Sequence, residues 1–332
     1  MTMKKVLPIK PFKDFYMNCW LNNYFSYLTY LESSYKIASY TNSYSYTIKD
    51  FKYNPLKFIT VDYSKSYKDL FEKEYITQEF YSFRDENNFN KELKEIILSG
   101  KPLYLYIDLF NWIPNSLVWQ KYHWNHFSFI VGFDDEKRIF YAIDDDANGN
   151  IDIRYIPESR LIDSFFGTGY FIDYGGHHTK PNIDSPCIIV NQSEHLEPYK
   201  IKVEQIVFNA KKIIDDLSKI DQIGCWEFIF NSDLDKVADV GIVQLNTIYN
   251  RHIGNMFLLN ELYKARFISD NSYKDLHATL HSLISNWKMA KNILIKAKSL
   301  KSLLSVGTSL ISIYDMNFEQ EHDYWNNMLK VL

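Results

Sequence analysis

A change of hydrophobic periodicity near residue 200 constrains the fold of this chain most. Before it, short apolar runs bounded by turn residues indicate strands, whereas beyond it apolar residues recur with the helical period of about 3.6. Helices are expected over 203–218, 241–267, 272–299 and 315–331. The pattern predicts an α+β fold in two domains: residues 1–195 with an antiparallel sheet, and a helical C-terminal region, 196–332, packing on it.

The first region carries a strand pattern and one conspicuous early helix. Residues 19–36 bear apolar and aromatic side chains on most faces, which is typical of a buried helix. Asn18 is a good N-cap, so Cys19 is expected in the first turn. Strands are expected over 102–109, 127–133, 139–143, 151–156 and 170–174, and short helices over 89–99, closed by Gly100, and 160–166.

Composition excludes several classes of function. A net charge of -4 without a basic stripe disfavours nucleic acid as a partner. Three widely spaced cysteines without a C-x-x-C pair disfavour a disulfide framework and a structural zinc site. No run reaches the roughly 20 apolar residues of a membrane span. The first residues have the basic start of a signal peptide, but Lys10, Lys13 and Asp14 interrupt the apolar region that should follow it. We therefore expect a cytoplasmic protein with no membrane partner.

Three residues fit the parts of a thiol-nucleophile enzyme. Cys19 opens the first helix, whose N-terminal partial positive charge favours a thiolate. If the hairpin turns at 134–137, His126 lies across from Asp144 or Asp145, roughly 5 Å away. A nucleophile, a base and a group that orients the base form a catalytic triad. The alternatives are a buried structural cysteine and a turn aspartate.

The order of motifs around these residues resembles a known family. Leu98-Ser-Gly-Lys-Pro-Leu-Tyr-Leu-Tyr-Ile-Asp108 precedes an aromatic loop, and His126-Phe-Ser-Phe-Ile-Val-Gly-Phe-Asp-Asp135 and Tyr141-Ala-Ile-Asp144 follow it. Together with an early helix-opening cysteine, this order is similar to the family of the N-terminal region of butirosin biosynthesis protein H. The resemblance covers roughly residues 15–175 and implies a papain-like, cysteine-protease-like fold.

The resemblance also implies a reaction. In this family an acyl or aminoacyl group passes from a carrier-protein thioester to the cysteine and then to an amine. A related use is the peptide ligase of closthioamide (polythioamide) assembly, a natural-product pathway. The resemblance implies Cys19 as nucleophile, His126 as base and then acid, Asp144 as the orienting carboxylate and Asp108 in a supporting role. The implied partner is an acyl or peptidyl carrier protein whose phosphopantetheine carries the substrate, with no bound cofactor or metal.

Some questions stay open at the level of sequence. Lys13 stands where papain-like enzymes often have glutamine, so Asn18 or backbone N–H groups at the helix start are the expected oxyanion donors. The same triad would also serve a cysteine peptidase or thioesterase, and a degenerate scaffold would serve binding alone. The run from Asp144 to Gly149 matches half of an EF-hand loop. Tyr155 replaces the required glutamate, which favours a turn.

Overall fold

The computed structural model describes residues 2–51, 54–63, 76–83, 85–116, 118–121, 123–146, 149–169, 186–192, 196–220, 234–301 and 303–332. The chain divides into two units, each with its own internal contacts. The first unit comprises Met1–Ser33 and Asp69–Pro198, and the second comprises Ser34–Lys68 and Tyr199–Leu332. The fold is mixed α/β, with an antiparallel sheet and a helical C-terminal region, as the periodicity predicts.

The first unit is built on one antiparallel sheet. Its elements are β1 (Lys4–Val6), α1 (Cys19–Leu31), β4 (Ile76–Tyr81), α4 (Glu86–Leu98), β5 (Leu103–Asp108), the 3-10 turn η1 (Leu109–Asn111), β6 (Asn125–Asp134), β7 (Ile139–Asp145), β8 (Ile151–Pro157), α5 (Glu158–Phe166) and β9 (Cys187–Gln192). Among the described residues the strands lie in the order β4-β9-β5-β6-β7-β8, and β1 pairs with the far half of β6.

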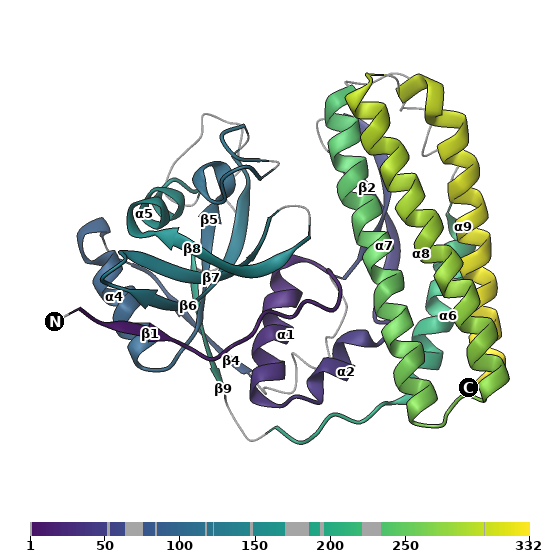
Figure 1. The fold of residues 1–332 in the computed structure, drawn as a ribbon, viewed down its shortest axis with the longest axis horizontal. Coiled ribbons are helices and arrows are strands. Elements are labelled where there is room, and N and C mark those ends of the chain that lie inside the picture. Colours follow the sequence, from purple (N-terminus) through teal and green to yellow (C-terminus); the bar gives the residue numbers. More distant parts are fainter. Residues whose placement is uncertain are drawn as a thin grey trace. The chain divides into compact units, whose positions relative to one another are not determined.

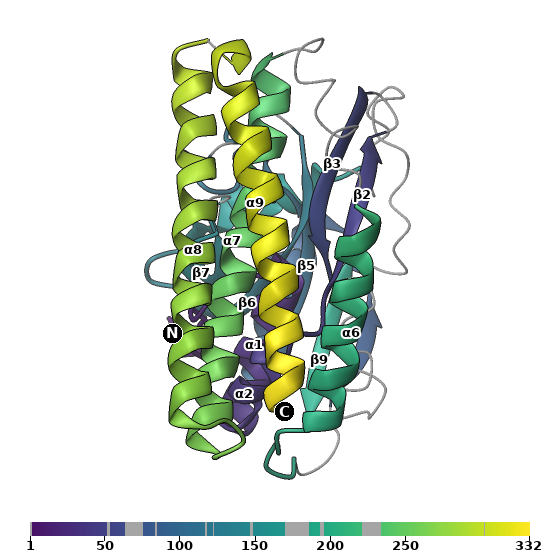
Figure 2. The same ribbon diagram turned by 90° about the vertical axis from the view of Figure 1, so that its right-hand side faces the viewer.

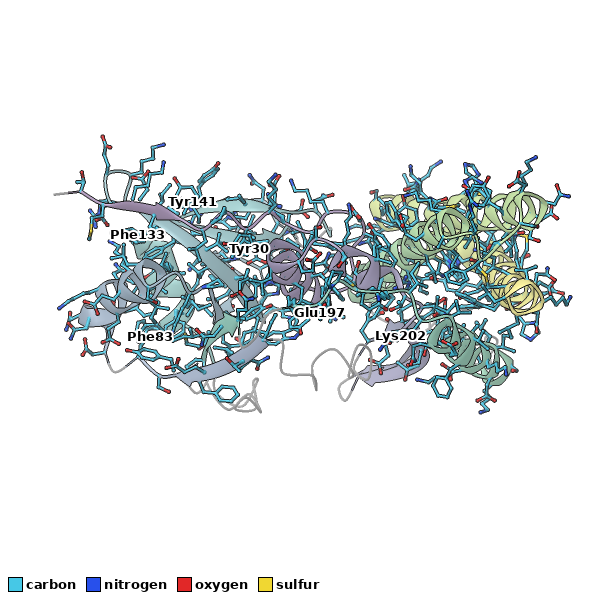
Figure 3. The ribbon with its side chains drawn as sticks, turned by 90° about the horizontal axis from the view of Figure 1, so that it is seen from below. Tyr30, Phe83, Phe133, Tyr141, Glu197 and Lys202 are labelled. Carbon is cyan, nitrogen blue, oxygen red and sulfur yellow. The ribbon has the colours of Figure 1, made fainter. Side chains whose placement is uncertain are left out.

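Helices cover both faces of this sheet (Figure 1). On one face, alternate residues of β5 meet the apolar stripes of α4 and α5 in a core that includes Leu105, Leu93 and Phe165. Phe83 and Phe133, labelled in Figure 3, belong to the same core. The other face packs against α1, with which β6 and β7 are in contact. Helix α1 is thereby held against the two strands that carry the predicted histidine and aspartate.

Local signals explain where the first-unit helices begin and end. The Asp85 side chain accepts a hydrogen bond from the Asn88 N–H and caps α4. Gly100 follows that helix with φ +87, in the left-handed region that glycine adopts without strain. This is the predicted stop. The strand expected over 170–174 lies outside the described residues.

Strand β9, which lies between β4 and β5, was not predicted from the sequence. It is formed by the short apolar run Cys187-Ile-Ile-Val, which is buried on both faces. Such a run lacks the alternation that marks a half-exposed strand, so periodicity did not reveal it.

The second unit combines a helical bundle with a two-stranded sheet (Figure 2). Its elements are α2 (Tyr35–Tyr40), β2 (Ser45–Phe51), β3 (Asn54–Asp62), α6 (Val203–Lys219), α7 (Leu234–Lys264), α8 (Asp270–Ser299) and α9 (Leu303–Val331). Helix α8 packs between α7 and α9, while α6 contacts β2 and α7 contacts β3. This division differs from a single boundary at residue 195, because residues 34–68 pack with the C-terminal helices.

Candidate active site

Cys19 is the first residue of α1, and the residues before it fix that start. Asn18 has an extended backbone, and its Oδ1 accepts a hydrogen bond from the Leu21 N–H at 2.8 Å. Asn18 is therefore the N-cap that the sequence predicts. Asn22 ties the entering chain to the helix, accepting from the Met17 N–H and donating to the Phe15 carbonyl, both at 2.8 Å. Cys19 itself is half-buried.

His126 and Asp144 are in direct contact across the β6–β7 hairpin. The Nε2 atom of His126 lies 2.7 Å from Oδ1 of Asp144. The predicted contact between His126 and Asp144 is present, but the two residues are not directly opposite each other in the β6–β7 ladder. Phe129 pairs with Ile143, after an irregularity between Ile130 and Gly132, so the ladder continued would set Asp144 two residues along from His126. The histidine reaches the carboxylate diagonally, a distance that long side chains can span.

Asp144 is fully buried, and two further donors satisfy it. Trp112 Nε1 donates to Oδ2 at 2.6 Å, and the Asp145 backbone N–H donates to Oδ1 at 2.8 Å. Trp112 is itself fully buried, just after η1. Trp112 was not among the predicted site residues. A buried tryptophan needs an acceptor for its N–H, which was a usable signal for this contact.

The histidine and the thiol interact. Burial by itself lowers the pKa of His126, but the negative charge of Cys19, then that of Asp144, and hydrogen bonds to both outweigh it and hold the pKa well above the usual range. Because Nε2 faces Asp144, Nδ1 is the ring nitrogen left for the sulfur. The structure thus brings Cys19, His126 and Asp144 into one chain of contacts.

A tyrosine–aspartate pair borders the same cluster. The Tyr16 hydroxyl donates to Oδ2 of Asp145 at 3.2 Å. Burial, then the charges of Asp145 and Cys19, raise the pKa of Tyr16 well above its ordinary value. The phenol therefore stays neutral and remains a hydrogen-bond donor near the sulfur. Tyr16 was not among the predicted residues, because no local pattern links it to a carboxylate 129 positions away.

Asp108 lies apart from the three contacts above and organises a loop. Its Oδ1 accepts hydrogen bonds from the backbone N–H groups of Phe110 at 3.0 Å and Trp124 at 3.1 Å. Its Oδ2 lies 2.6 Å from Nδ1 of His123. Asp108 is buried at the end of β5. Because it accepts from N–H groups on both sides of the loop between β5 and β6, it ties the two ends of that loop together. This contact with His123 was not predicted.

The start of α1 supplies donors suited to an oxyanion. Asn18 uses its Oδ1 for the cap, which leaves its Nδ2 group as the donor of that side chain. The N–H groups of Cys19 and Trp20 belong to the first helical turn, where no intrahelical acceptor is available. Both options raised by the sequence remain compatible with this geometry.

A metal has one candidate position in the described part of the chain. Ligand atoms of His126, Asp144 and Asp145 lie within 4.8 Å of one another. Each already has a hydrogen-bonding partner, namely Asp144, Trp112 and Tyr16 respectively. A cation would have to replace these contacts, so the arrangement fits proton transfer better than coordination.

The remaining predicted features that lie within the described residues are structural. Asp146 accepts hydrogen bonds from the backbone and side chain of Asn150, at 3.2 and 2.9 Å, as expected of a turn. Cys187 is completely buried in β9, and this burial raises the pKa of its thiol far above the ordinary range. A buried thiol with a raised pKa forms little thiolate, so Cys187 is not a candidate nucleophile. Cys225 lies outside the described residues.

Comparison with known proteins does not assign this chain to a family. No model of a known family matches the sequence, and no curated protein matches it either. Among the described helices, none has the length and apolar character needed to cross a membrane. The geometry of the site is therefore the basis for assigning a function.

Proposed function

We propose that this chain is a Cys–His–Asp acyltransferase that forms amide bonds. It would take an acyl or aminoacyl group from the phosphopantetheine thioester of a carrier protein and transfer it to an amine, in a cytoplasmic natural-product pathway. One observation carries the proposal: a half-buried cysteine at a helix start interacts with a histidine that a fully buried carboxylate holds in place. A helix opened by the nucleophile and packed on the sheet that bears the other two residues also supports a papain-like fold for the first unit.

Acylation of the enzyme is the first step. The sulfur of Cys19 attacks the thioester carbonyl, and the carbonyl oxygen becomes an oxyanion that N–H groups at the start of α1 stabilise. The pantetheine carbon–sulfur bond breaks, and His126 gives its proton to the departing thiolate. Asp144 stabilises the imidazolium and fixes the ring orientation, as the third member of a triad does.

Transfer to the acceptor is the second step. The amine nitrogen attacks the carbonyl carbon of the acyl–Cys19 thioester, and His126 accepts a proton from that nitrogen. The carbon–sulfur bond to Cys19 breaks, and the amide leaves. Amide formation competes with attack by water, so a site that favours aminolysis must limit access of water to the acyl group.

The test is incubation of the protein with an acyl-pantetheine thioester, followed by intact-mass measurement. We expect a mass increase of one acyl group, located on Cys19 by peptide mapping and lost in Cys19→Ala. Cys187 and Cys225 serve as internal controls for nonspecific acylation. Addition of a primary amine should then release the amide and restore the original mass.

Other outcomes separate the alternatives. Release of free acid alone, even with abundant amine, would identify a thioesterase or peptidase that uses the same residues. Failure of Cys19 to be acylated, together with alkylation by iodoacetamide no faster than that of the other cysteines, would contradict enzymatic use of the site. In that case the first unit would be a binding scaffold.

A further inference from the structure

The backbone on either side of Tyr16 is held by one side chain of α1. The Oδ1 atom of Asn22 accepts a hydrogen bond from the Met17 N–H, and its Nδ2 atom donates to the Phe15 carbonyl oxygen, both at 2.8 Å. Asn22 is 1% exposed and lies in α1, three residues after Cys19. Because both flanking peptide groups are bonded to α1, the Tyr16 side chain leaves the backbone at a place fixed relative to the first turn of that helix.

The Tyr16 side chain reaches the strand that carries the aspartate of the candidate triad. Its hydroxyl donates to Oδ2 of Asp145 at 3.2 Å. Asp145 is buried at the end of β7, and its backbone N–H donates to Oδ1 of Asp144, the oxygen that His126 contacts. Side-chain atoms of His126, Asp144 and Asp145 lie within 4.8 Å of one another. The phenol is therefore bonded to a carboxylate that borders the imidazole.

The nucleophile and its base come from two different elements. Cys19 opens α1 and His126 lies on β6, so their contact depends on how the start of α1 lies against β6 and β7. The hydrogen bond from Tyr16 to Asp145 joins the segment entering α1 to the end of β7. The negative charge of Cys19 is one cause of the raised pKa of Tyr16, which agrees with a sulfur close to this bond.

We propose that the Tyr16–Asp145 hydrogen bond holds the start of α1 against the end of β7 and so keeps the Cys19 sulfur within reach of His126. Tyr16 is a positioning residue, because it acts through the place of the sulfur and takes no part in proton transfer. The inference rests on the proposed function, in which the thiol and the imidazole must be in contact. Misplacement of reacting groups by about 1 Å is enough to slow an enzyme roughly a hundredfold.

The test uses Tyr16→Phe in the full chain, which keeps the ring and removes only the hydroxyl. Two quantities are measured: the rate at which iodoacetamide alkylates Cys19, followed by peptide mapping, and the pKa of His126, followed by NMR. We expect alkylation to slow at least about threefold and the pKa of His126 to fall by roughly half a unit or more. The pKa falls because the charge of Cys19, which raises it, would lie further from the ring. Neither measurement needs an acyl donor.

Two further variants serve as controls. In Asp145→Ala the acceptor of the hydrogen bond is gone, so adding Tyr16→Phe should change neither quantity further. Tyr141 is the matched tyrosine, because its hydroxyl donates to Oδ2 of Asp134 at 3.5 Å, at the turn end of the same β6–β7 hairpin. Tyr141→Phe should leave both the alkylation rate and the pKa of His126 near their wild-type values.

Each other result overturns the inference. If Tyr16→Phe changes neither quantity, or only one of them, the hydrogen bond does not set the distance between the sulfur and the imidazole. If Tyr16→Phe causes a further loss in the Asp145→Ala background, Tyr16 acts without Asp145. Alkylation of wild-type Cys19 no faster than that of the other cysteines is a different result. It contradicts the proposed function itself, and with it the contact that Tyr16 would maintain.

Discussion

Asp144 is the residue on which the candidate site depends most, because it is a carboxylate with no exposed surface. A buried charge is costly unless hydrogen bonds satisfy it. Its donors come from three directions: His126 across the hairpin, the Asp145 backbone and the indole of Trp112. The Trp112 contact engages the oxygen that His126 leaves unused. It therefore helps decide which way the carboxylate faces the imidazole.

Replacing Trp112 with phenylalanine should weaken the triad without removing any member of it. The ring volume is largely kept, but the N–H donor to Asp144 is lost and a buried carboxylate oxygen is left unsatisfied. We expect a loss of about 1–3 kcal/mol in the free energy of unfolding. We also expect slower acylation of Cys19, by roughly tenfold, measured by intact mass under single-turnover conditions.

A neighbouring tryptophan provides the control. Trp119 lies in the same loop, where the Arg160 guanidinium sits 5.3 Å from its ring, and it has no contact with the triad among the described interactions. Trp119→Phe should leave the acylation rate near that of wild type. Equal rates for Trp112→Phe and wild type would mean that the indole packs beside Asp144 without positioning it.

At the residue scale, the sequence predicted contacts between residues that lie close together along the chain. Asn18 was predictable as a cap because capping joins a side chain to a backbone N–H only three positions later. The contact between His126 and Asp144 followed from a hairpin closed by four residues. Trp112 and Tyr16 reach the carboxylates of Asp144 and Asp145 from distant segments, and no short-range pattern encodes such pairs.

Strand β1 illustrates a constraint at the scale of elements. It runs antiparallel to the end of β6, with Val6 opposite Gly132. A Cβ added at Gly132 would lie 2.7 Å from the Lys5 carbonyl oxygen and 2.9 Å from the Val6 Cα. Those atoms belong to backbone, which cannot move aside as a side chain can. Glycine is needed here for close approach of the two strands.

Gly132→Ala should therefore displace β1 from the sheet. We expect a loss of about 1–3 kcal/mol from the clash, measured as a shift of the urea midpoint. Hydrogen exchange should rise most in residues 4–6. In Gly100→Ala the strain comes from φ alone, since nothing lies within 4 Å of the added atom, and the loss should be nearer about 1 kcal/mol. A larger effect at Gly100 than at Gly132 would contradict this account.

Helices and strands were predictable where their hydrophobic pattern is clear over the whole segment. The stripes of α4 and α6 and the apolar runs of β5 and β7 were visible in the sequence and are present close to the expected bounds. Strand β9 was missed because its short apolar run does not alternate, and its place in the sheet depends on pairing with β5, about 80 residues earlier in the chain. Sheet order is a long-range property, so periodicity alone does not report it.

At the scale of the whole molecule, the chain crosses between its two units more than once. It leaves the first unit after Ser33, returns at Asp69 and leaves again after Pro198. The residues of β2 and β3 were assigned to the first region because they precede residue 195, where the helical part was expected to begin. They pack instead with α6 and α7. Composition cannot reveal that an inserted hairpin belongs with later helices.

The core of the second unit contains a buried charge of its own. Glu321 is fully buried on α9 and accepts hydrogen bonds from the hydroxyls of Tyr44 at 2.9 Å and Tyr46 at 2.7 Å. His252 Nε2 lies 3.4 Å from its Oε2, within ion-pair distance but outside hydrogen-bond geometry. This carboxylate links the inserted hairpin to the C-terminal helix.

Acid should weaken the second unit through Glu321. Burial alone raises the pKa of this carboxyl, but His252, Tyr46 and Tyr44 outweigh it and lower the pKa. A lowered folded-state pKa means stability that is present above the unfolded value, about 4.3, and is lost as pH falls through the folded value. Glu321→Gln cannot titrate, so it should remove that acid sensitivity. At neutral pH it should cost about 1–3 kcal/mol.

Hydrogen exchange measured against pH separates the two units in one experiment. In wild type, protection of residues 309–331 should fall on acidification, and Glu321→Gln should flatten that dependence while leaving the pH response of β5 unchanged. Glu319→Gln, an exposed position on the same helix, is the matched control and should behave as wild type. If Glu321→Gln flattens both units equally, the two units unfold as one cooperative body. If it flattens neither, the tyrosines rather than the charge hold the hairpin to α9.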